Sequence, residues 1–243
     1  TPEIQTNYCL CWANENWTRA WYGQNKEILI SNTYNEDNAL NFIKTVSPYF
    51  QDDRYIKIDG KPLLLVYEPD LIHNTRNYAK VWRNYVESIG FRGIYLASVE
   101  ALTLGVNPAE YGFDTAIEFA PDWTKAHLLS DRNTSHRIFD YKETVKNMIL
   151  KPEPGYPRFN CVFPSWDNTP RYKNSAITFI NNTPGAFKYF LHATIEKTKN
   201  KFTPDNQFLF INAWNEWGEG CHLEPDQANG YAYLQILKEL MQG

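Results

Sequence analysis

Short, almost uninterrupted apolar runs recur along this chain, and segments with helical spacing lie between them. The clearest run is residues 63–66 (LLLV), where no polar residue alternates with the apolar ones. Strands of this kind are covered on both faces, which is typical of parallel sheets in α/β proteins. The pattern therefore predicts a fold built from repeated strand–helix units.

Six segments are predicted as strands and five as helices. The strands are residues 8–14, 63–67, 94–99, 115–119, 160–164 and 208–214, and the helices are residues 37–46, 78–89, 141–150, 184–198 and 231–241. No strand leads into a glycine-rich phosphate loop, which disfavours a nucleotide-binding doubly wound sheet. We therefore expect an α/β fold of the TIM-type (β/α)8 barrel class, with residues 1–243 as a single domain.

Charge and composition exclude two kinds of partner. With 24 Lys and Arg against 28 Asp and Glu, the formal net charge is -4, so no basic surface for nucleic acid is expected. No run approaches the ~20 apolar residues of a membrane-spanning helix. The four cysteines contain no CxxC pair and are predicted to be buried free thiols, which favours a reducing, cytoplasmic location.

Aromatic and polar residues gather just after the predicted strands, where ligands bind in α/β barrels. Seven of the eight tryptophans lie at or past a strand end, Trp21 among them. Indoles cover the C–H faces of sugars, while amides, carboxylates and guanidinium groups hold the hydroxyls, so the pattern indicates a carbohydrate site. The alternative is that these indoles cap the barrel core. The predicted ligand-binding residues are Trp12, Asn14, Glu15, Trp17, Tyr67, Glu118, Trp166, Asp167, Arg171, Trp214, Asn215 and Trp217.

Glu216 and Glu219 form the sharpest chemical signal, because tryptophans flank them. Two carboxyl groups beside an apolar wall can take different pKa values, as glycosidic bond cleavage requires. Alternation along residues 208–216 directs Glu216 toward the barrel axis. Glu219 shares that site only if the chain bends, which Gly218 and Gly220 permit. Otherwise the two glutamates belong to a solvated loop.

A metal site is a weaker interpretation of the same segment. Glu216, Glu219, His222 and Glu224 have spacings that occur in di-iron proteins, but such proteins need two motifs on facing helices. Only one cluster is found here, and it contains two glycines. We therefore expect no metal and no cofactor.

Three motifs resemble a known family. Residues 9–19 (CLCWANENWTR), 54–67 (RYIKIDGKPLLLVY) and 212–220 (NAWNEWGEG), followed by 223–226 (LEPD), look like the WbsX domain of bacterial polysaccharide loci, which is named a glycosyltransferase there. The chain is also similar to glycoside hydrolase family 99, the retaining endo-α-mannosidases, which fold as (β/α)8 barrels. The resemblance spans nearly the whole chain.

This resemblance implies roles for the two glutamates. Glu216 would act as the base on the sugar 2-hydroxyl, giving a 1,2-anhydro intermediate, and Glu219 would protonate the leaving oxygen and then activate water. The implied substrate is an α-linked, mannose-like glycan of a surface polysaccharide, such as lipopolysaccharide O-antigen or capsule. The hydrolases usually have His before the second Glu, whereas this chain has Gly218.

The resemblance also implies an incomplete barrel. The family barrel has eight strands and this chain looks as if it enters at the third, so six strand–helix units are expected and the first two are missing. The chain begins at Thr1, and its first methionine is Met148. Since a sheet without two strands exposes parallel edges, we expect this stretch alone to be unstable and inactive, with the missing strands as its partner.

Two other functions are kept as alternatives: a non-catalytic glycan-binding barrel and a nucleotide-sugar-dependent glycosyltransferase. Hydrolysis and transfer would both use Glu216 and Glu219, with water or a sugar hydroxyl as the acceptor. A nucleotide-sugar donor would need a phosphate site, and the sequence shows none. Carboxyl groups in one pocket favour catalysis, whereas Glu219 turned to solvent favours binding alone.

Overall fold

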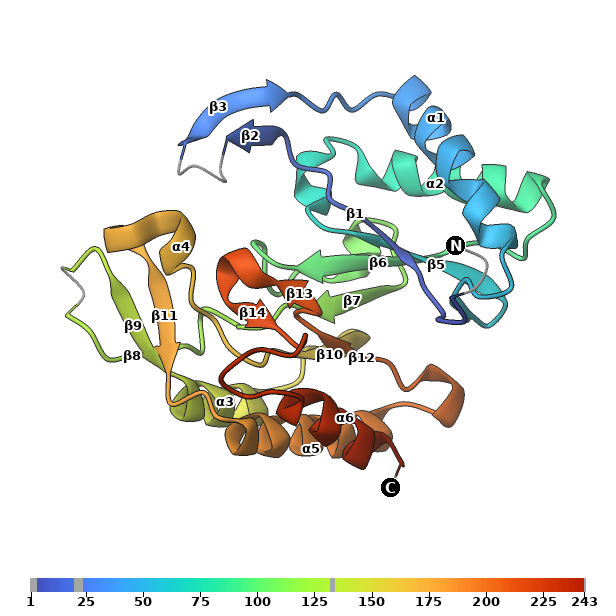
Figure 1. Ribbon diagram of the computed structural model, residues 1–243. Helices are drawn as coiled ribbons and strands as arrows, with labels where there is room; N and C mark the ends of the chain where they lie inside the picture. The colour runs from blue at the N-terminus through green and yellow to red at the C-terminus, as the bar shows by residue number, and fades with distance from the viewer. Residues whose placement is uncertain (1–3, 20–23, 132–133, 243) are drawn as a thin grey trace. The chain divides into compact units, whose positions relative to one another are not determined.

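Figure 1 shows the computed structural model, which describes residues 4–19, 24–131 and 134–242. These residues form two compact units. Unit 1 contains residues 4–18, 28–117 and 154–158, and unit 2 contains residues 19, 24–27, 118–131, 134–153 and 159–242. Each unit has its own hydrophobic core. The assignment of residues 1–243 to one domain stays a prediction.

The sheet of unit 1 keeps its strands in chain order. β1 (Leu10–Trp12), β5 (Lys61–Val66), β6 (Tyr95–Glu100) and β7 (Thr115–Glu118) follow one another, and β4 (Lys57–Ile58) pairs antiparallel with β5. β5 runs parallel to both β1 and β6. Five of the six residues of β5 are buried, which confirms the prediction from its apolar run.

Two helices of unit 1, α1 (Glu36–Val46) and α2 (Thr75–Ser88), lie side by side (Figure 1). Each begins after an asparagine, Asn35 or Asn74, whose side chain accepts a hydrogen bond from the backbone N–H three residues on. Trp82 of α2 is fully buried, and its indole N–H donates to the Ala39 carbonyl oxygen at 3.0 Å. This hydrogen bond links the two helices inside the core.

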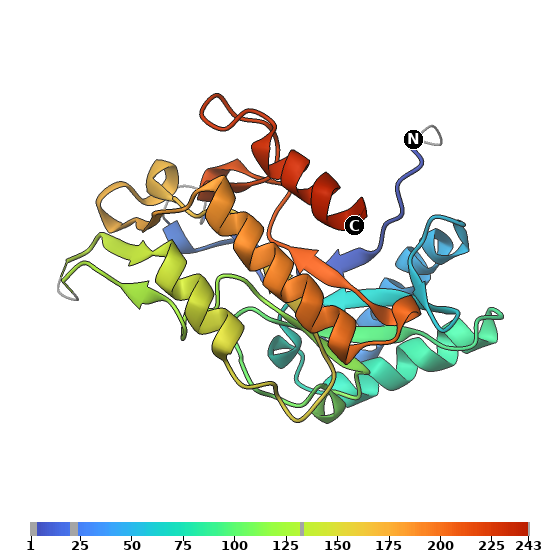
Figure 2. The ribbon, with the colours of Figure 1, turned by 90° about the horizontal axis from the view of Figure 1, so that it is seen from below.

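Unit 2 contains the last two predicted strands and three of the predicted helices. β10 (Arg158–Val162) and β12 (Leu209–Ile211) pair in parallel. Figure 2 shows α3 (Tyr141–Leu150), α5 (Pro184–Lys201) and α6 (Ala232–Gln242) packed in a row. As predicted, Thr183 caps α5 by accepting the Ala186 N–H, and Pro184 occupies the first turn.

Several short elements were not predicted. β2 (Trp17–Arg19) and β3 (Gln24–Ile30) form a two-stranded sheet, and β13 (Asn215–Glu216) pairs antiparallel with β14 (Cys221–His222). In unit 2, β8 (His127–Leu128), β9 (Arg137–Asp140) and β11 (Ile177–Ile180) form a three-stranded sheet, and α4 (Thr169–Tyr172) precedes β11. Most of these elements have two to four residues, too few for a periodic pattern, whereas the seven-residue β3 was missed although it is as long as the predicted strands.

All six predicted strands and all five predicted helices are present, with the bounds of α3 as expected. The strand predicted over residues 208–214 was too long, because β12 ends at Ile211 and Glu216 pairs with Cys221 in a separate hairpin. Alternation along one strand therefore cannot orient Glu216. The strand predicted over residues 8–14 is also shorter, since β1 covers only Leu10–Trp12.

The cysteines and the helices bear on two further predictions. All four cysteines are free thiols, as expected, but only Cys161 and Cys221 are buried; Cys9 is half-buried and Cys11 is exposed, so the prediction of burial was wrong for these two. Among the described residues, no helix combines the length and apolar character that a bilayer crossing requires.

Candidate functional site

Glu216 and Glu219 meet on one cation in unit 2. Glu216 ends β13, Glu219 ends the 3-10 turn Trp217–Glu219, and Arg171 comes from α4. Arg171 Nη1 lies 2.8 Å from Glu219 Oε1, and Arg171 Nη2 lies 3.4 Å from Glu216 Oε2. One guanidinium group therefore contacts both carboxylates that the sequence selected.

The bend between the two glutamates depends on Gly220. Its φ is +58°, in the left-handed region that favours glycine, and its N–H closes the turn on the Trp217 carbonyl oxygen at 3.0 Å. The neighbouring loop binds this turn: the Asp167 N–H donates to the Glu219 carbonyl oxygen at 2.7 Å, and the Ser165 hydroxyl donates to the Gly220 carbonyl oxygen at 2.5 Å. The glycine bend expected from the sequence is present.

The two carboxyl groups lie in unequal surroundings. The side chain of Glu219 is 26% exposed, while that of Glu216 is 44% exposed. Burial raises the pKa of Glu219 above its usual value, the charge of Arg171 opposes that rise, and the charge of Glu216 adds to it. Glu219 is therefore placed to hold a proton and donate it.

Gly218 leaves the space that Arg171 occupies. A Cβ at position 218 would lie 2.7 Å from both Nε and Nη2 of Arg171, closer than nonbonded atoms approach. The guanidinium therefore fills the volume in which a side chain at 218 would begin. This gives a physical reason for glycine at the position where the hydrolases that the chain resembles usually have His.

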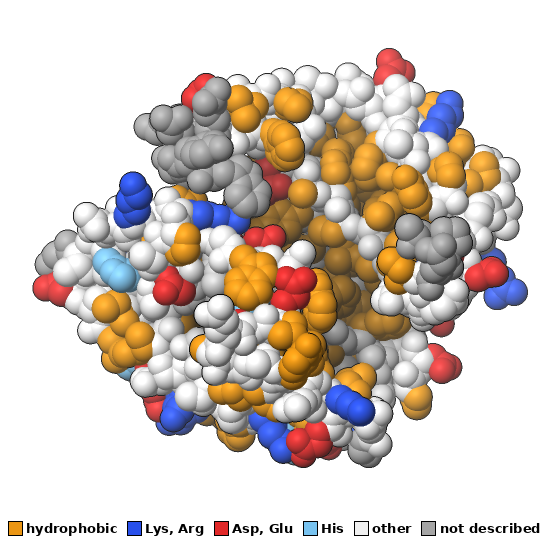
Figure 3. Space-filling model, viewed as in Figure 1, with side chains coloured by type: hydrophobic (Ala, Val, Ile, Leu, Met, Phe, Trp, Pro, Cys, Tyr) orange, Lys and Arg blue, Asp and Glu red, His pale blue; other side chains and the backbone are white. Residues whose placement is uncertain are grey.

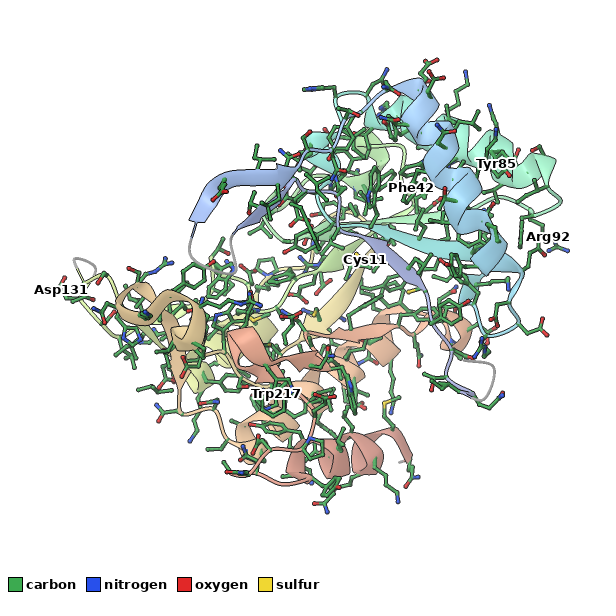
Figure 4. All side chains as sticks on the ribbon, turned by 45° about the horizontal axis from the view of Figure 1, so that its top comes forward. Cys11, Phe42, Tyr85, Arg92, Asp131 and Trp217 are labelled. Atoms are coloured by element: carbon green, nitrogen blue, oxygen red, sulfur yellow. The ribbon has the colours of Figure 1, made fainter. Side chains whose placement is uncertain are left out.

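Trp217 is held from one side and open on the other. His222 stacks on it, with ring centroids 3.7 Å apart and planes at 18°, and the indole N–H donates to Glu224 Oε2 at 2.6 Å. Trp217 is still 48% exposed, and Trp214 is 52% exposed. Figure 3 shows hydrophobic, acidic and basic side chains together over α4, β13 and β14, and Figure 4 labels Trp217. A fixed, half-exposed indole next to Glu216 suits the C–H face of a sugar.

The other predicted residues around this turn differ in exposure. Trp166 is buried and packs edge-on against Trp123, with ring centroids 5.2 Å apart, so it lies in the core of unit 2 as the core-capping alternative expected. Asp167 is exposed, and its carboxylate accepts the Thr169 N–H at 2.9 Å at the start of α4. Asn215 is exposed beside Glu216.

Glu118 lies in a buried ion cluster of unit 2. Lys151 contacts Glu118 Oε1, and its Nζ lies 2.8 Å from Asp122 Oδ2; each of the three side chains is 7% exposed or less. The second oxygen of Glu118 accepts the Cys161 N–H at 3.2 Å. The charge of this predicted ligand-binding residue is therefore compensated inside the protein.

In unit 1, two of the predicted residues serve the packing of the strand ends. Trp12 stacks on Phe42 of α1, labelled in Figure 4, with ring centroids 4.3 Å apart. Asn14 is fully buried, and its side-chain amide donates to the Glu68 carbonyl oxygen at 2.7 Å while accepting the Glu68 N–H at 2.8 Å. Asn14 thus ties the end of β1 to the end of β5.

The remaining predicted residues of unit 1 are more accessible. Trp17 is 67% exposed, and Glu15 and Tyr67 are half-buried. Trp21, noted in the sequence, lies outside the described residues.

A hollow beyond the carboxyl ends of β5 and β6 contains one predicted ligand-binding residue, Tyr67, and glutamates that were not among those predicted. Its walls include Tyr67, Glu68 and Glu100. Burial raises the pKa of Glu68, and the charges of Glu15 and Asp70 add to that rise. Glu68 directly follows the second predicted strand, and this position after a strand is the sequence feature that could have selected it.

Within residues 4–19, 24–131 and 134–242, no group of three or more His, Cys, Asp or Glu side chains is placed to hold a metal ion. Two members of the metal alternative, His222 and Glu224, instead contact the indole of Trp217.

Comparison with known proteins assigns the family. A family model described as "Glycosyltransferase WbsX" matches residues 1–237. The chain belongs to the WbsX glycosyltransferase family. Two uncharacterized WxcX proteins, from two strains of Xanthomonas campestris pv. campestris, are each 34% identical to this WbsX chain over 244 residues. Those matches cover 98% of this chain but 35% of each relative, so the chain spans about a third of their length.

Solved structures share the fold of this WbsX chain at 16% sequence identity. A glycoside hydrolase-like protein aligns with a TM-score of 0.57 over 86% of this chain and 62% of that chain. The family 99 endo-α-mannosidase of Bacteroides thetaiotaomicron aligns at 0.53 over 87% and 64%, and its complex with bis-tris-propane at 0.55 over 96% and 78%. The predicted fold class, an incomplete (β/α)8 barrel, is thereby confirmed.

Proposed function

We propose that this WbsX chain carries the two catalytic carboxyl groups of an enzyme that acts, with retention of configuration, on an α-linked, mannose-like sugar of a bacterial surface polysaccharide. Lipopolysaccharide O-antigen and capsule are the expected sources of that sugar. The observation that carries the proposal is the meeting of Glu216 and Glu219 on Arg171. Two nearby carboxyl groups in unlike surroundings suit acid–base cleavage of a glycosidic bond.

The proposed reaction has two steps. Glu216 takes the proton of the sugar 2-hydroxyl, whose oxygen attacks C1, while the bond from C1 to the leaving oxygen breaks and Glu219 protonates that oxygen. Water or a sugar hydroxyl then attacks C1 and gives its proton to Glu219, the bond from C1 to the sugar oxygen O2 breaks, and Glu216 returns the proton to O2. Two inversions at C1 result in net retention. The raised pKa of Glu219 supports its role as the acid.

The choice of substrate is supported by the aromatic surface beside the carboxyl groups. Trp214 and Trp217 are each about half exposed, and His222 holds Trp217 in one orientation. The mannose preference is carried over from the endo-α-mannosidase among the similar structures. We further propose that the reaction takes place in the cytoplasm and needs no cofactor.

Glycosyl transfer is favoured over hydrolysis by one observation, the family description as a glycosyltransferase. Both reactions use the same two carboxyl groups and differ only in whether water or a sugar hydroxyl attacks in the second step. An assay that supplies both acceptors therefore tests them together.

The test incubates the full-length protein that contains this chain with α-linked manno-oligosaccharides of each linkage, with and without an added sugar acceptor. Proton NMR follows the anomeric configuration of the first product, which we expect to be retained. Glu216→Gln and Glu219→Gln should each lower the rate by about 100-fold or more. Glu239→Gln is the matched control, because this carboxylate of α6 is 60% exposed and pairs with Lys188.

The other possible outcomes either refute the mechanism or support one of the alternative functions. Wild-type rates in both active-site variants would refute the mechanism. Glycan binding without turnover, measured by calorimetry, would support the binding barrel. Turnover only with a nucleotide sugar would support the nucleotide-sugar-dependent transferase.

A further inference from the structure

The cation shared by Glu216 and Glu219 reaches them across a residue that has no side chain. The Arg171 guanidinium lies directly against Gly218, one residue before Glu219 and two after Glu216. We infer that Arg171 and Gly218 work as one unit: the missing side chain at 218 admits the guanidinium, which then positions the two carboxylates. The catalytic meaning of this inference rests on the proposed function, whereas the contacts themselves do not.

Arg171 reaches the turn from an anchored base. Its side chain is 15% exposed, and its backbone N–H donates to the Asn168 carbonyl oxygen at 3.0 Å. Asn168 is buried, and its side-chain oxygen accepts the Ile177 N–H at 2.6 Å, which ties the start of α4 to β11. An anchored, planar guanidinium loses less freedom when it binds two carboxylates than a free side chain would.

The space at Gly218 controls whether Arg171 can stay. An added Cβ would lie 2.7 Å from Nε and Nη2 and 3.0 Å from Cζ of Arg171. Gly218 is not among the glycines with positive φ, so the backbone itself accepts alanine. The conflict is with the far end of a flexible side chain, which can swing away. Gly218→Ala should therefore displace the guanidinium without unfolding the turn.

The shared cation has two electrostatic effects. It offsets the repulsion between Glu216 and Glu219, which would otherwise favour turning the two carboxylates apart. It also limits the rise in the pKa of Glu219 that burial causes. Both effects should disappear together when the guanidinium leaves, whichever of the two residues is changed.

The test measures the pKa of Glu219 directly in the full chain. Carbon-13 NMR follows the side-chain carboxyl signals through a pH titration, and Glu219→Gln assigns the Glu219 signal by its loss. Arg171→Gln should raise the pKa of Glu219 by about one unit or more, because a neighbouring positive charge is removed. Gly218→Ala should shift it in the same direction. The double variant should shift no further than Arg171→Gln alone, since both changes remove one contact.

Two variants serve as controls. Gly185→Ala, in the first turn of α5, adds a Cβ that meets nothing within 4 Å and should leave the pKa of Glu219 unchanged. Arg171→Lys keeps the positive charge but lacks the planar guanidinium, so it should raise the pKa of Glu219 less than Arg171→Gln does. The inference is overturned if Gly218→Ala melts like the wild type and leaves the pKa of Glu219 unchanged. Additive shifts in the double variant would overturn it as well.

An activity measurement separates this inference from the proposed function. The high-pH limb of the rate profile of the full-length protein, which reports loss of the Glu219 proton, should move to higher pH in Arg171→Gln and Gly218→Ala. If the NMR shift occurs but no glycan is turned over, the positioning role stands and the proposed function fails. If glycan is turned over and neither variant shifts the pKa, the proposed function stands and the positioning role fails.

Discussion

Replacing Gly220 with alanine tests whether the turn that joins Glu216 to Glu219 requires a residue without a side chain. The φ of +58° places Gly220 in the left-handed region, where a residue with a Cβ costs about 1–2 kcal/mol. The added Cβ would also lie 2.7 Å from the carbonyl oxygen and 2.8 Å from the nitrogen of Asp167. Because both atoms belong to the backbone, no side chain can move aside to make room.

The second cost comes from the hydrogen bonds between the two loops. Moving Asp167 away from Gly220 lengthens the bond from its N–H to the Glu219 carbonyl oxygen and the bond from Ser165 to the Gly220 carbonyl oxygen. Each such bond contributes about 1 kcal/mol. Gly220→Ala should therefore lower the free energy of unfolding by about 3–4 kcal/mol in all.

Gly230→Ala is the matched control for this variant. Gly230 has a φ of +54°, but a Cβ there would meet nothing within 4 Å, so only the backbone cost of about 1–2 kcal/mol applies. The difference between the two variants is about 2 kcal/mol, which for a chain of this length is a difference in melting temperature of about 4–8 °C. Urea and thermal unfolding measured on both variants give this difference. Equal destabilisation would refute the argument that the Asp167 backbone closes the space at Gly220.

Three further variants test the supporting contacts. Lys151→Met should destabilise the protein by about 3–5 kcal/mol at neutral pH, because it leaves buried carboxylates without a cation. Burial favours a higher pKa for Asp122, but the hydrogen bond from Lys151 outweighs it, so the pKa of Asp122 is lowered overall. The stabilisation by Lys151 is therefore present above pH ~4 and is lost at lower pH. Urea titrations of the wild type and Lys151→Met should converge there. Asn14→Ala should cost about 2 kcal/mol or more in thermal unfolding, because it leaves the N–H and carbonyl of Glu68 without their partner. Trp217→Ala should weaken glycan affinity about tenfold in calorimetry, because an aromatic stacking contact contributes about 1.5 kcal/mol.

Each of these variants has a contrary result. Lys188→Met, which removes an exposed partner of Glu239, should lower the free energy of unfolding by less than about 1 kcal/mol. If Lys151→Met lowered it by no more than Lys188→Met does, the argument from burial would be contradicted. If Asn14→Ala were as stable as the wild type, water would have to replace the Asn14 amide in its hydrogen bonds to the Glu68 backbone. Unchanged glycan affinity in Trp217→Ala would remove the indole from the binding surface.

The strands and helices of this protein were predictable because their signals are local. The run at residues 63–66 indicated a strand covered on both faces, and five of the six residues of β5 are buried. Thr183 and Pro184 marked the start of α5, where the side chain of Thr183 caps the helix. Both are properties of neighbouring residues, which the amino-acid sequence states directly.

Strand position alone did not separate exposed from buried candidates. Trp12 and Trp166 lie at or past strand ends just as Trp214 and Trp217 do. Trp12 nevertheless packs against the core of unit 1 and Trp166 lies in the core of unit 2, whereas Trp214 and Trp217 are each about half exposed. Glu118 follows a strand as well, but Lys151, which is 33 residues later in the sequence, compensates its charge. Which face a side chain takes depends on partners that are distant in the sequence.

The amino-acid sequence by itself determined the class of fold, the order of its strands and helices, and the two glutamates on a glycine-containing turn, because periodicity and turn chemistry act over a few residues. Only the tertiary structure decided that Arg171, 45 residues before Glu216, joins the two carboxylates, and that Gly218 and Gly220 serve different neighbours. Gly218 leaves room for a side chain, whereas Gly220 leaves room for a backbone. Such close approaches arise only when separate loops pack against each other, and no local pattern of residues encodes them.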